Sequence, residues 1–312
     1  MHKLRKFYYD NKDKIWVVIG FIAFILIIIQ FFNYRVKSKN EANVMTNNTT
    51  NVVNEESNVD IKSNISTVQG EVISSQILNK HTQLISKFLD FCNENEIENA
   101  YNMLSDECKV ELYKNSQDFY DNYVKNIIAD GNKKIATVEN WIGATYKVNF
   151  KDDMMATGNT STKSTEDYIT IVKDDKINIS NFIGKEKINK KSTQYNGIEI
   201  TIVEKSIYMD YEEYTIKIFN GTNNRILIDS LESTKKMYIT DNNDMKYYAR
   251  THEISNSLLK IPTKATSELK IKYTRSYSAS RTIKSLVFEG LILDYNEYMN
   301  GNKTENKYEI NI

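Results

Sequence analysis

The distribution of apolar residues divides the chain into three regions with different patterns. Residues 15–32 are almost all apolar, residues 77–128 place apolar residues every three or four positions, and the chain after residue 134 largely alternates apolar with polar residues. A continuous apolar run predicts a membrane span, a spacing of three or four predicts amphipathic helices, and alternation predicts β-strands. Helices followed by a run of strands indicate the α+β class.

The apolar run Ile15–Phe32 predicts one membrane-spanning helix. It contains no charge, and Gln30 is its only strongly polar residue. As a helix it would measure about 27 Å, close to the thickness of the hydrocarbon layer of a bilayer. A cleaved signal peptide and a buried core helix fit less well, because the run is long, apolar on all sides and not followed by small residues. We predict an uncleaved signal anchor over residues 15–34.

The flanking charges predict the orientation of this span. Five Lys and Arg residues precede it and three follow it before residue 40. Positive residues favour the cytoplasmic side, so residues 1–14 are expected inside the cell and the rest of the chain outside. Residues 35–73 are rich in Asn, Ser, Thr and Glu and hold no aromatic residue, which predicts a disordered tether.

The first folded region, residues 74–186, is expected to begin with helices and end with strands. Ser105 and Ser116 are predicted N-caps, since a Ser side chain accepts hydrogen bonds from the free amides of a first helical turn. Asp174–Asp175 predicts a hairpin turn. The apolar face of the first helix comprises Ile77, His81, Leu84, Ile85, Phe88, Leu89 and Cys92. Strands are predicted near 134–141, 144–150, 153–158, 166–173 and 176–183.

The second folded region, residues 196–300, reads as almost entirely β. Alternating runs such as Ile198–Ile202 and Tyr214–Ile218 are separated by turn sequences such as Asn220–Gly221. Short strands with turns at this spacing predict a two-sheet sandwich. Between the two regions, the Lys-rich stretch 187–195 predicts a solvated linker, and residues 301–312 are left as a C-terminal tail.

Composition excludes several functional classes. Lys and Arg number 41 and Asp and Glu number 41, so the net charge of zero gives no reason to expect nucleic-acid binding. Two Cys residues exclude a disulfide scaffold and a four-Cys zinc site. The sequence has no nucleotide-binding, zinc-protease or serine-hydrolase motif, so an enzyme is not predicted and neither a cofactor nor a metal is expected.

Two stretches of the first folded region resemble a known fold family. The strings EIENAYNMLSDECKVEL (96–112) and SQDFYDNYVKNI (116–127), followed by a strand with Trp141, resemble the NTF2-like cone fold. The resemblance implies a curved sheet wrapped against helices around a concave pocket. Its members include enzymes, ligand binders and assembly modules without catalysis. The whole layout resembles VirB8-like and TcpC-like membrane components of conjugation machines.

The second folded region carries a further resemblance. A Tyr-x-Ile-x-Ile strand ending at an Asn-x-Thr turn, and the later string ITDNNDMKYY (239–248), resemble Ig-like, DUF4352-like modules of Gram-positive surface proteins. This resemblance implies an all-β Ig-like sandwich. It also supports placing the region outside the cell.

Five residues stand out as site candidates. Trp141, Tyr146 and Tyr168 are candidates for lining a ligand pocket of the cone, although aromatic residues at strand spacing are more often simple core. Cys92 and Cys108 could form a disulfide outside the cell or stay as two buried free thiols, and the sequence leaves both open.

The predicted function follows from location more than from chemistry. We expect a single-pass protein of a Gram-positive-type envelope that contacts the bilayer through residues 15–34 and acts in interaction or assembly, with a protein partner or further copies of itself. It would serve a conjugation or secretion machine. The alternatives are binding of a small ligand or cell-wall polymer in the cone pocket, or, less well supported, a hydrolase or isomerase in that pocket.

The predicted orientation can be tested by shaving intact cells with a protease. The region after residue 34 should be degraded without cell lysis, because it lies outside the membrane, whereas an epitope tag before Lys3 should stay intact. Complete protection of the C-terminal region in intact cells, with digestion after lysis, would reverse the predicted orientation.

Overall fold

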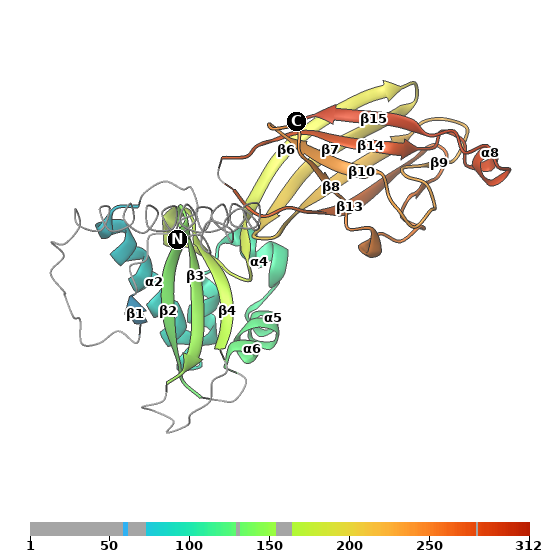
Figure 1. Ribbon diagram of the computed structural model, residues 1–312. Helices are drawn as coiled ribbons and strands as arrows, with labels where there is room; N and C mark the ends of the chain where they lie inside the picture. Colours follow the sequence, from blue (N-terminus) through green and yellow to red (C-terminus); the bar gives the residue numbers. More distant parts are fainter. Residues whose placement is uncertain (1–58, 62–72, 129–131, 154–163, 279) are drawn as a thin grey trace, which may run out of the picture. The chain divides into compact units, whose positions relative to one another are not determined.

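The computed structural model describes residues 59–61, 73–128, 132–153, 164–278 and 280–312 (Figure 1). The chain divides into two compact units, Met1–Glu55 and Glu56–Ile312, and every element below belongs to the second. The predicted cytoplasmic segment, signal anchor and most of the tether lie outside the described residues. Within those residues, no helix is both long and apolar enough to cross a bilayer.

The α+β class is confirmed, with helices preceding several antiparallel sheets. Ser105 caps its helix as predicted, because its hydroxyl oxygen accepts a hydrogen bond from the Cys108 amide at 3.0 Å. The predicted cap at Ser116 is wrong by one residue: Asn115 is extended, and its side chain accepts from the Asp118 amide at 2.8 Å. The helices are α2 (Ser75–Asn93), α3 (Ile97–Met103), α4 (Asp106–Leu112), α5 (Ser116–Phe119) and α6 (Lys125–Ile127), with a π-helical turn at Tyr120–Val124.

A five-stranded sheet follows these helices in the order β1-β2-β3-β4-β5. Its strands are β1 (Val59–Ile61), β2 (Lys134–Ile142), β3 (Thr145–Asp152), β4 (Ser164–Ile171) and β5 (Ile177–Asn178). β1 pairs parallel to β2, so three residues of the predicted tether belong to the sheet. The predicted strand 176–183 is interrupted, because Ser180 and Asn181 adopt φ angles of 58° and 62° that end β5.

The helices cover one face of this sheet. On that face Tyr146, Val148 and Phe150 of β3 belong to the same buried cluster as Phe88 of α2 and Phe119 of α5, which we call the first core. Strand alternation places Lys147 and Asn149 on the opposite face, which we call the outer face. The predicted strand 153–158 lies mainly outside the described residues, since β3 ends at Asp152.

The stretch predicted as a linker, 187–195, is part of a strand. β6 runs from Phe182 to Tyr195 and pairs antiparallel with β7 (Ile198–Tyr208). Its side chains do not alternate between apolar and polar, so the sequence pattern did not predict this strand, which forms through backbone hydrogen bonds to β7. β6 lies at the edge of its sheet, where Lys residues protect against pairing with other chains.

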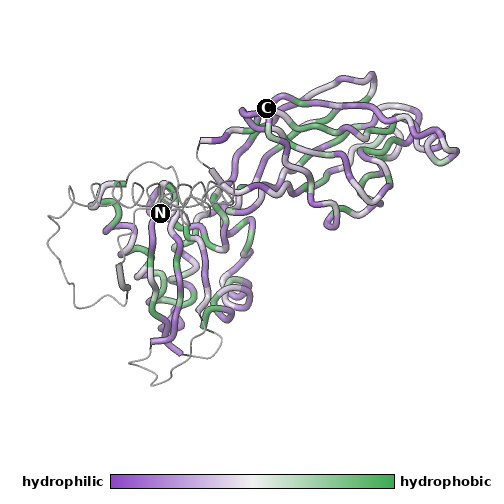
Figure 2. Tube along the Cα trace, in the orientation of Figure 1, coloured by the Kyte–Doolittle hydropathy of each residue, from purple (hydrophilic) through white to green (hydrophobic). Residues whose placement is uncertain are grey.

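Two four-stranded antiparallel sheets make up the rest of the chain, in the orders β13-β8-β7-β6 and β11-β10-β14-β15. Apolar residues of both sheets form one buried cluster, the second core, to which Ile216 and Phe288 contribute. Figure 2 shows the alternation of hydropathy along these strands. The remaining bounds are β8 (Tyr211–Asn220), β9 (Ile226–Leu227), β10 (Met237–Asp241), β11 (Lys246–Tyr248), β12 (Lys260–Ile261), β13 (Ala265–Thr274), β14 (Ile283–Leu291), α8 (Tyr295–Met299) and β15 (Asn306–Asn311).

β15 lies within the segment predicted as a tail, 301–312. Its residues Tyr308 and Ile310 are buried in the second core, so the folded region extends to the last strand. The edges of the two sheets also meet. The Gln194 side chain donates to the Glu309 carbonyl and accepts from its amide on one side, and Ala249 bridges to Tyr273 on the other.

Candidate functional site

The three predicted pocket residues do not come together on one face of the sheet. Tyr146 is fully buried in the first core. Tyr168 pairs in register with Lys147, which places it on the outer face, and Trp141 lies 5.6 Å from Tyr168 between ring centroids. Trp141 alternates with its buried neighbour Ile142 on β2, which places it on the same outer face as Tyr168.

Tyr146 forms a polar pair with His81 of α2. Its hydroxyl lies 2.7 Å from His81 Nδ1, and the two rings meet edge to face at 5.6 Å. Burial raises the pKa of Tyr146 to about 12, although Asn140 opposes this shift by hydrogen bonding to it. Burial, followed by the charge of Lys80, lowers the pKa of His81. Both side chains are therefore uncharged at neutral pH, and the pair is a satisfied contact at the rim of the core.

A buried carboxylate, Asp167 of β4, also lies in the first core. Its Oδ1 accepts hydrogen bonds from the amides of Tyr168 at 2.7 Å and Asn181 at 3.0 Å. Its Oδ2 accepts from the Tyr123 hydroxyl at 2.7 Å and the Ser180 amide at 2.9 Å. Burial raises the pKa of Asp167, and these four donors oppose the shift.

Four donors occupy the acceptor positions of one carboxylate, so Asp167 has no position left for a substrate proton. Its visible role is to hold the strained residues Ser180 and Asn181 in the turn that leads to β6. Asp167 was not among the residues predicted to be functional. Its position two residues before Ile169 could have identified it, because strand alternation places both side chains toward the core.

Cys92 and Cys108 are both buried free thiols in the structure. Cys92 lies on α2 and Cys108 on α4, and both belong to the first core. Burial raises the pKa of each thiol to about 12. At neutral pH they are protonated and behave as small apolar side chains, which makes neither a nucleophile.

The outer face combines aromatic and charged side chains around Trp141 and Tyr168. Lys147 Nζ lies 5.9 Å from the centre of the Trp141 ring and 2.8 Å from a carboxylate oxygen of Glu166. Glu139, Lys147 and Tyr168 form one row across β2, β3 and β4. Unlike the polar groups of the first core, these side chains are partly exposed.

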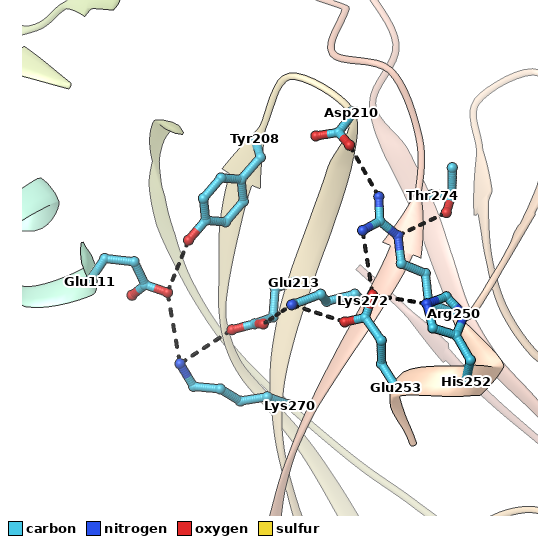
Figure 3. A network of polar contacts seen from close by, with 10 residues as sticks. All are labelled: Glu111, Tyr208, Asp210, Glu213, Arg250, His252, Glu253, Lys270, Lys272 and Thr274. Atoms are coloured by element: carbon cyan, nitrogen blue, oxygen red, sulfur yellow. Dashed lines mark hydrogen bonds and ion pairs between the residues drawn. The ribbon is translucent and has the colours of Figure 1, made fainter. Parts of the chain in front are cut away.

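A polar network joins α4 to β6, β7 and β13 (Figure 3). Its centre is Glu111 of α4, whose side chain is only 7% exposed. Glu111 accepts from Lys185 Nζ of β6 at 3.0 Å and from the Tyr208 hydroxyl of β7 at 3.5 Å, and lies 3.8 Å from Lys270 Nζ of β13. Three strands are thereby tied to one helix.

The network continues along the surface as alternating charges. Lys270 and Lys272 lie 3.2 Å and 4.0 Å from Glu213, and Lys272 lies 2.9 Å from Glu253. Arg250 then reaches Asp210 and Glu253, with its guanidinium 4.5 Å from the centre of the Tyr211 ring. Because many of these side chains are half-exposed, their ion pairs contribute little to stability. Loss of the buried Glu111 is therefore expected to lower the free energy of unfolding most.

Within the described residues, no group of three or more His, Cys, Asp or Glu side chains is arranged to hold a metal ion. Asp241 acts as a turn residue: its carboxylate accepts from the Asn243 and Met245 amides and from the Tyr247 hydroxyl.

Comparison of the chain with protein-family models, curated proteins and solved structures finds no match.

The two thiols should react with a thiol reagent only when the chain unfolds. At pH 8 labelling of the native protein should be at least about a hundredfold slower than in denaturant, because a buried thiol of raised pKa supplies almost no thiolate. A Lys87→Cys variant, whose new thiol is exposed on α2, should label quickly and serves as the control. Failure to label either Cys in denaturant without a reductant would show a disulfide.

Removal of the Glu111 charge should weaken the contact between α4 and the strands. Glu111→Gln should lower the free energy of unfolding by about 1.5–3 kcal/mol, the range for a hydrogen bond to a charged group, in denaturant titrations at pH 7. The matched control is Glu268→Gln, whose pair with Lys217 is 52% exposed on both sides and is expected to contribute about 0–1 kcal/mol.

The effect of Glu111→Gln should also depend on pH. Burial alone would raise the pKa of Glu111, but the hydrogen bond from Lys185 and the charges of Lys270 and Lys185 outweigh it and hold the pKa below its ordinary value. The stabilisation is therefore complete above the unfolded pKa and is lost as pH falls through the folded pKa. A difference between wild type and variant that grows on acidification would contradict this assignment.

Proposed function

We propose that this protein is a membrane-anchored, extracytoplasmic module that acts by binding other components of a Gram-positive-type cell envelope. The span over 15–34 would anchor it, and the body over 56–312 would be presented outside. Assembly with a protein partner or with further copies would be its task, in a conjugation or secretion machine. The proposal does not include catalysis.

The observation that carries this proposal is that the reactive groups of the first core are engaged within the chain. Asp167 receives four hydrogen-bond donors, His81 Nδ1 and the Tyr146 hydroxyl are bonded to each other, and the two thiols are protonated. A general base needs a free lone pair within reach of a substrate, and a cysteine nucleophile needs to be a thiolate. Asp167 has no acceptor position left and the buried thiols of raised pKa supply almost no thiolate, so these groups are better suited to stability than to turnover.

The arrangement of elements supports the finer fold proposal. A long helix, a short helix after a polar break, and helices that pack on one face of an antiparallel sheet fit an NTF2-like domain. Two antiparallel sheets around one core fit an Ig-like sandwich. Assembly modules of such folds work through their surfaces, which agrees with reactive groups in the first core that are engaged within the chain.

The Glu111 network favours an assembly role over a simple spacer. It ties α4 to β6, β7 and β13, so charged side chains from one helix and three strands are gathered on one surface. A partner protein of complementary charge would meet several of these side chains at once.

Photo-crosslinking in intact cells tests the proposal. A photoreactive residue placed at Val110 or Lys217, both exposed, should give discrete crosslinked products in the membrane fraction. The same residue at buried Ile216 should give none and serves as the matched control. If no exposed position yields a product with protein, while the protein is present at normal level, the assembly proposal is wrong.

A further inference from the structure

We propose that the outer face of the five-stranded sheet binds a neutral polysaccharide strand, with Trp141 and Tyr168 as its aromatic platform. The inference concerns this face and not the cone interior. It rests on the extracytoplasmic location proposed above, because that is where a cell-wall glycan would meet the protein. The side chains that form this face come from β2, β3 and β4.

Sugar rings are recognised by a characteristic combination of groups. Their C–H faces pack on aromatic rings, and their hydroxyls exchange hydrogen bonds with carboxylates, amides and ammonium groups. The outer face supplies both kinds of group in one place. The ring centroids of Trp141 and Tyr168 lie 5.6 Å apart, and their planes are inclined by 69°. The pair therefore offers two aromatic rings in different orientations for stacking against sugars.

The polar groups lie in rows beside the aromatic pair. The register places Glu139, Lys147 and Tyr168 in one row and Thr137, Asn149 and Glu166 in the next. Rows two residues apart along a strand are separated by about 6.6 Å. All six side chains are at least partly exposed. Hydrogen-bond donors and acceptors that recur at this row spacing suit an extended polymer of hydroxylated rings.

Charge decides which polymer fits. Lys147, the cation beside the aromatic pair, is already paired with Glu166 at 2.8 Å, and Glu139 adds a further negative charge. Lys151 of the same face lies four residues further along β3, about 13 Å from Lys147. An anionic polymer requires an excess of positive charge, which this face lacks, so a neutral glycan is favoured.

A protein partner fits this face less well. The centre of a protein interface is depleted of charged residues and enriched in contiguous apolar and aromatic area. Here Glu139, Lys147 and Glu166 directly adjoin the two aromatic rings, so a protein would have to desolvate all three charges. A glycan leaves them partly hydrated while it stacks on the rings.

The test uses the full-length protein in detergent with a soluble N-acetylglucosamine tetrasaccharide and with insoluble chitin. Trp141 is one of two Trp residues, and the other, Trp16, lies in the predicted span. Titration with the tetrasaccharide should therefore change the emission of Trp141. Co-sedimentation with chitin should weaken by about tenfold or more in Trp141→Ala and Tyr168→Ala, as expected for loss of a central aromatic contact.

Control variants separate binding from folding. Tyr248→Ala removes an aromatic side chain that is 54% exposed on β11 and should leave chitin binding unchanged. Trp141→Phe and Tyr168→Phe keep an aromatic ring and should retain most of the binding, which a merely unfolded variant would not do. Thermal unfolding of each variant checks that the fold is intact.

Three results would overturn the proposal: no binding of chitin or tetrasaccharide by wild type, equal binding by the Ala variants, or a preference for an anionic polymer such as heparin. A change in oligomeric state caused by Trp141→Ala would instead assign the face to contacts between copies. These failures leave the location intact, because protease shaving tests the location separately. If the protein is protected from protease in intact cells but binds chitin normally, the proposed location is wrong and the proposed glycan-binding face stands.

Discussion

The backbone pairing of β6 with β7 is the interaction on which the rest of the structure depends. β6 starts with Phe182 in the first core and ends with Tyr195 packed against the second, and β7 follows it in the opposite direction to Tyr208 in the first core. One antiparallel ladder therefore spans both cores. Glu111 adds charge pairing to this ladder at the point where it leaves the first core, so a local helix is tied to a long-range strand contact. The two cores are therefore joined by a hydrogen-bonded strand pair and not by an irregular linker.

The sequence was informative where side-chain periodicity decides structure. The α+β class, the helix cap at Ser105 and the turn at 173–175 follow from local patterns. The pattern failed where backbone pairing or long-range contacts decide. β6 carries Lys residues instead of an apolar stripe, and β15 is short, so neither 187–195 nor 306–311 was assigned to a strand. Trp141, Tyr146 and Tyr168 were grouped as pocket candidates by their aromatic character, but strand alternation places Tyr146 in the first core and the other two on the outer face.

Polar groups fall into two classes with different physical roles. Those inside the first core, such as Asp167 and Tyr146, are bonded within the chain because an unpaired buried polar group destabilises the folded state. Those at the surface, such as Glu139 and Glu166, keep lone pairs that solvent or a ligand can use. The proposed glycan site uses the second class, because the exposed carboxylates and amides on the outer face of the sheet can still exchange hydrogen bonds with a ligand.

The position of β15 makes the second core depend on a contact between residues far apart in the sequence. β15 (Asn306–Asn311) pairs with β14 and buries Tyr308 and Ile310, and the Tyr308 hydroxyl donates to the Ser192 carbonyl of β6 at 2.6 Å across 116 positions of the chain. Bringing such distant residues together costs loop-closure entropy before the contact stabilises the fold, so pairing of this kind forms slowly. Until β15 docks, the apolar side chains that it covers stay exposed, so the rate of this folding step is expected to decide how readily the unfolded chain aggregates.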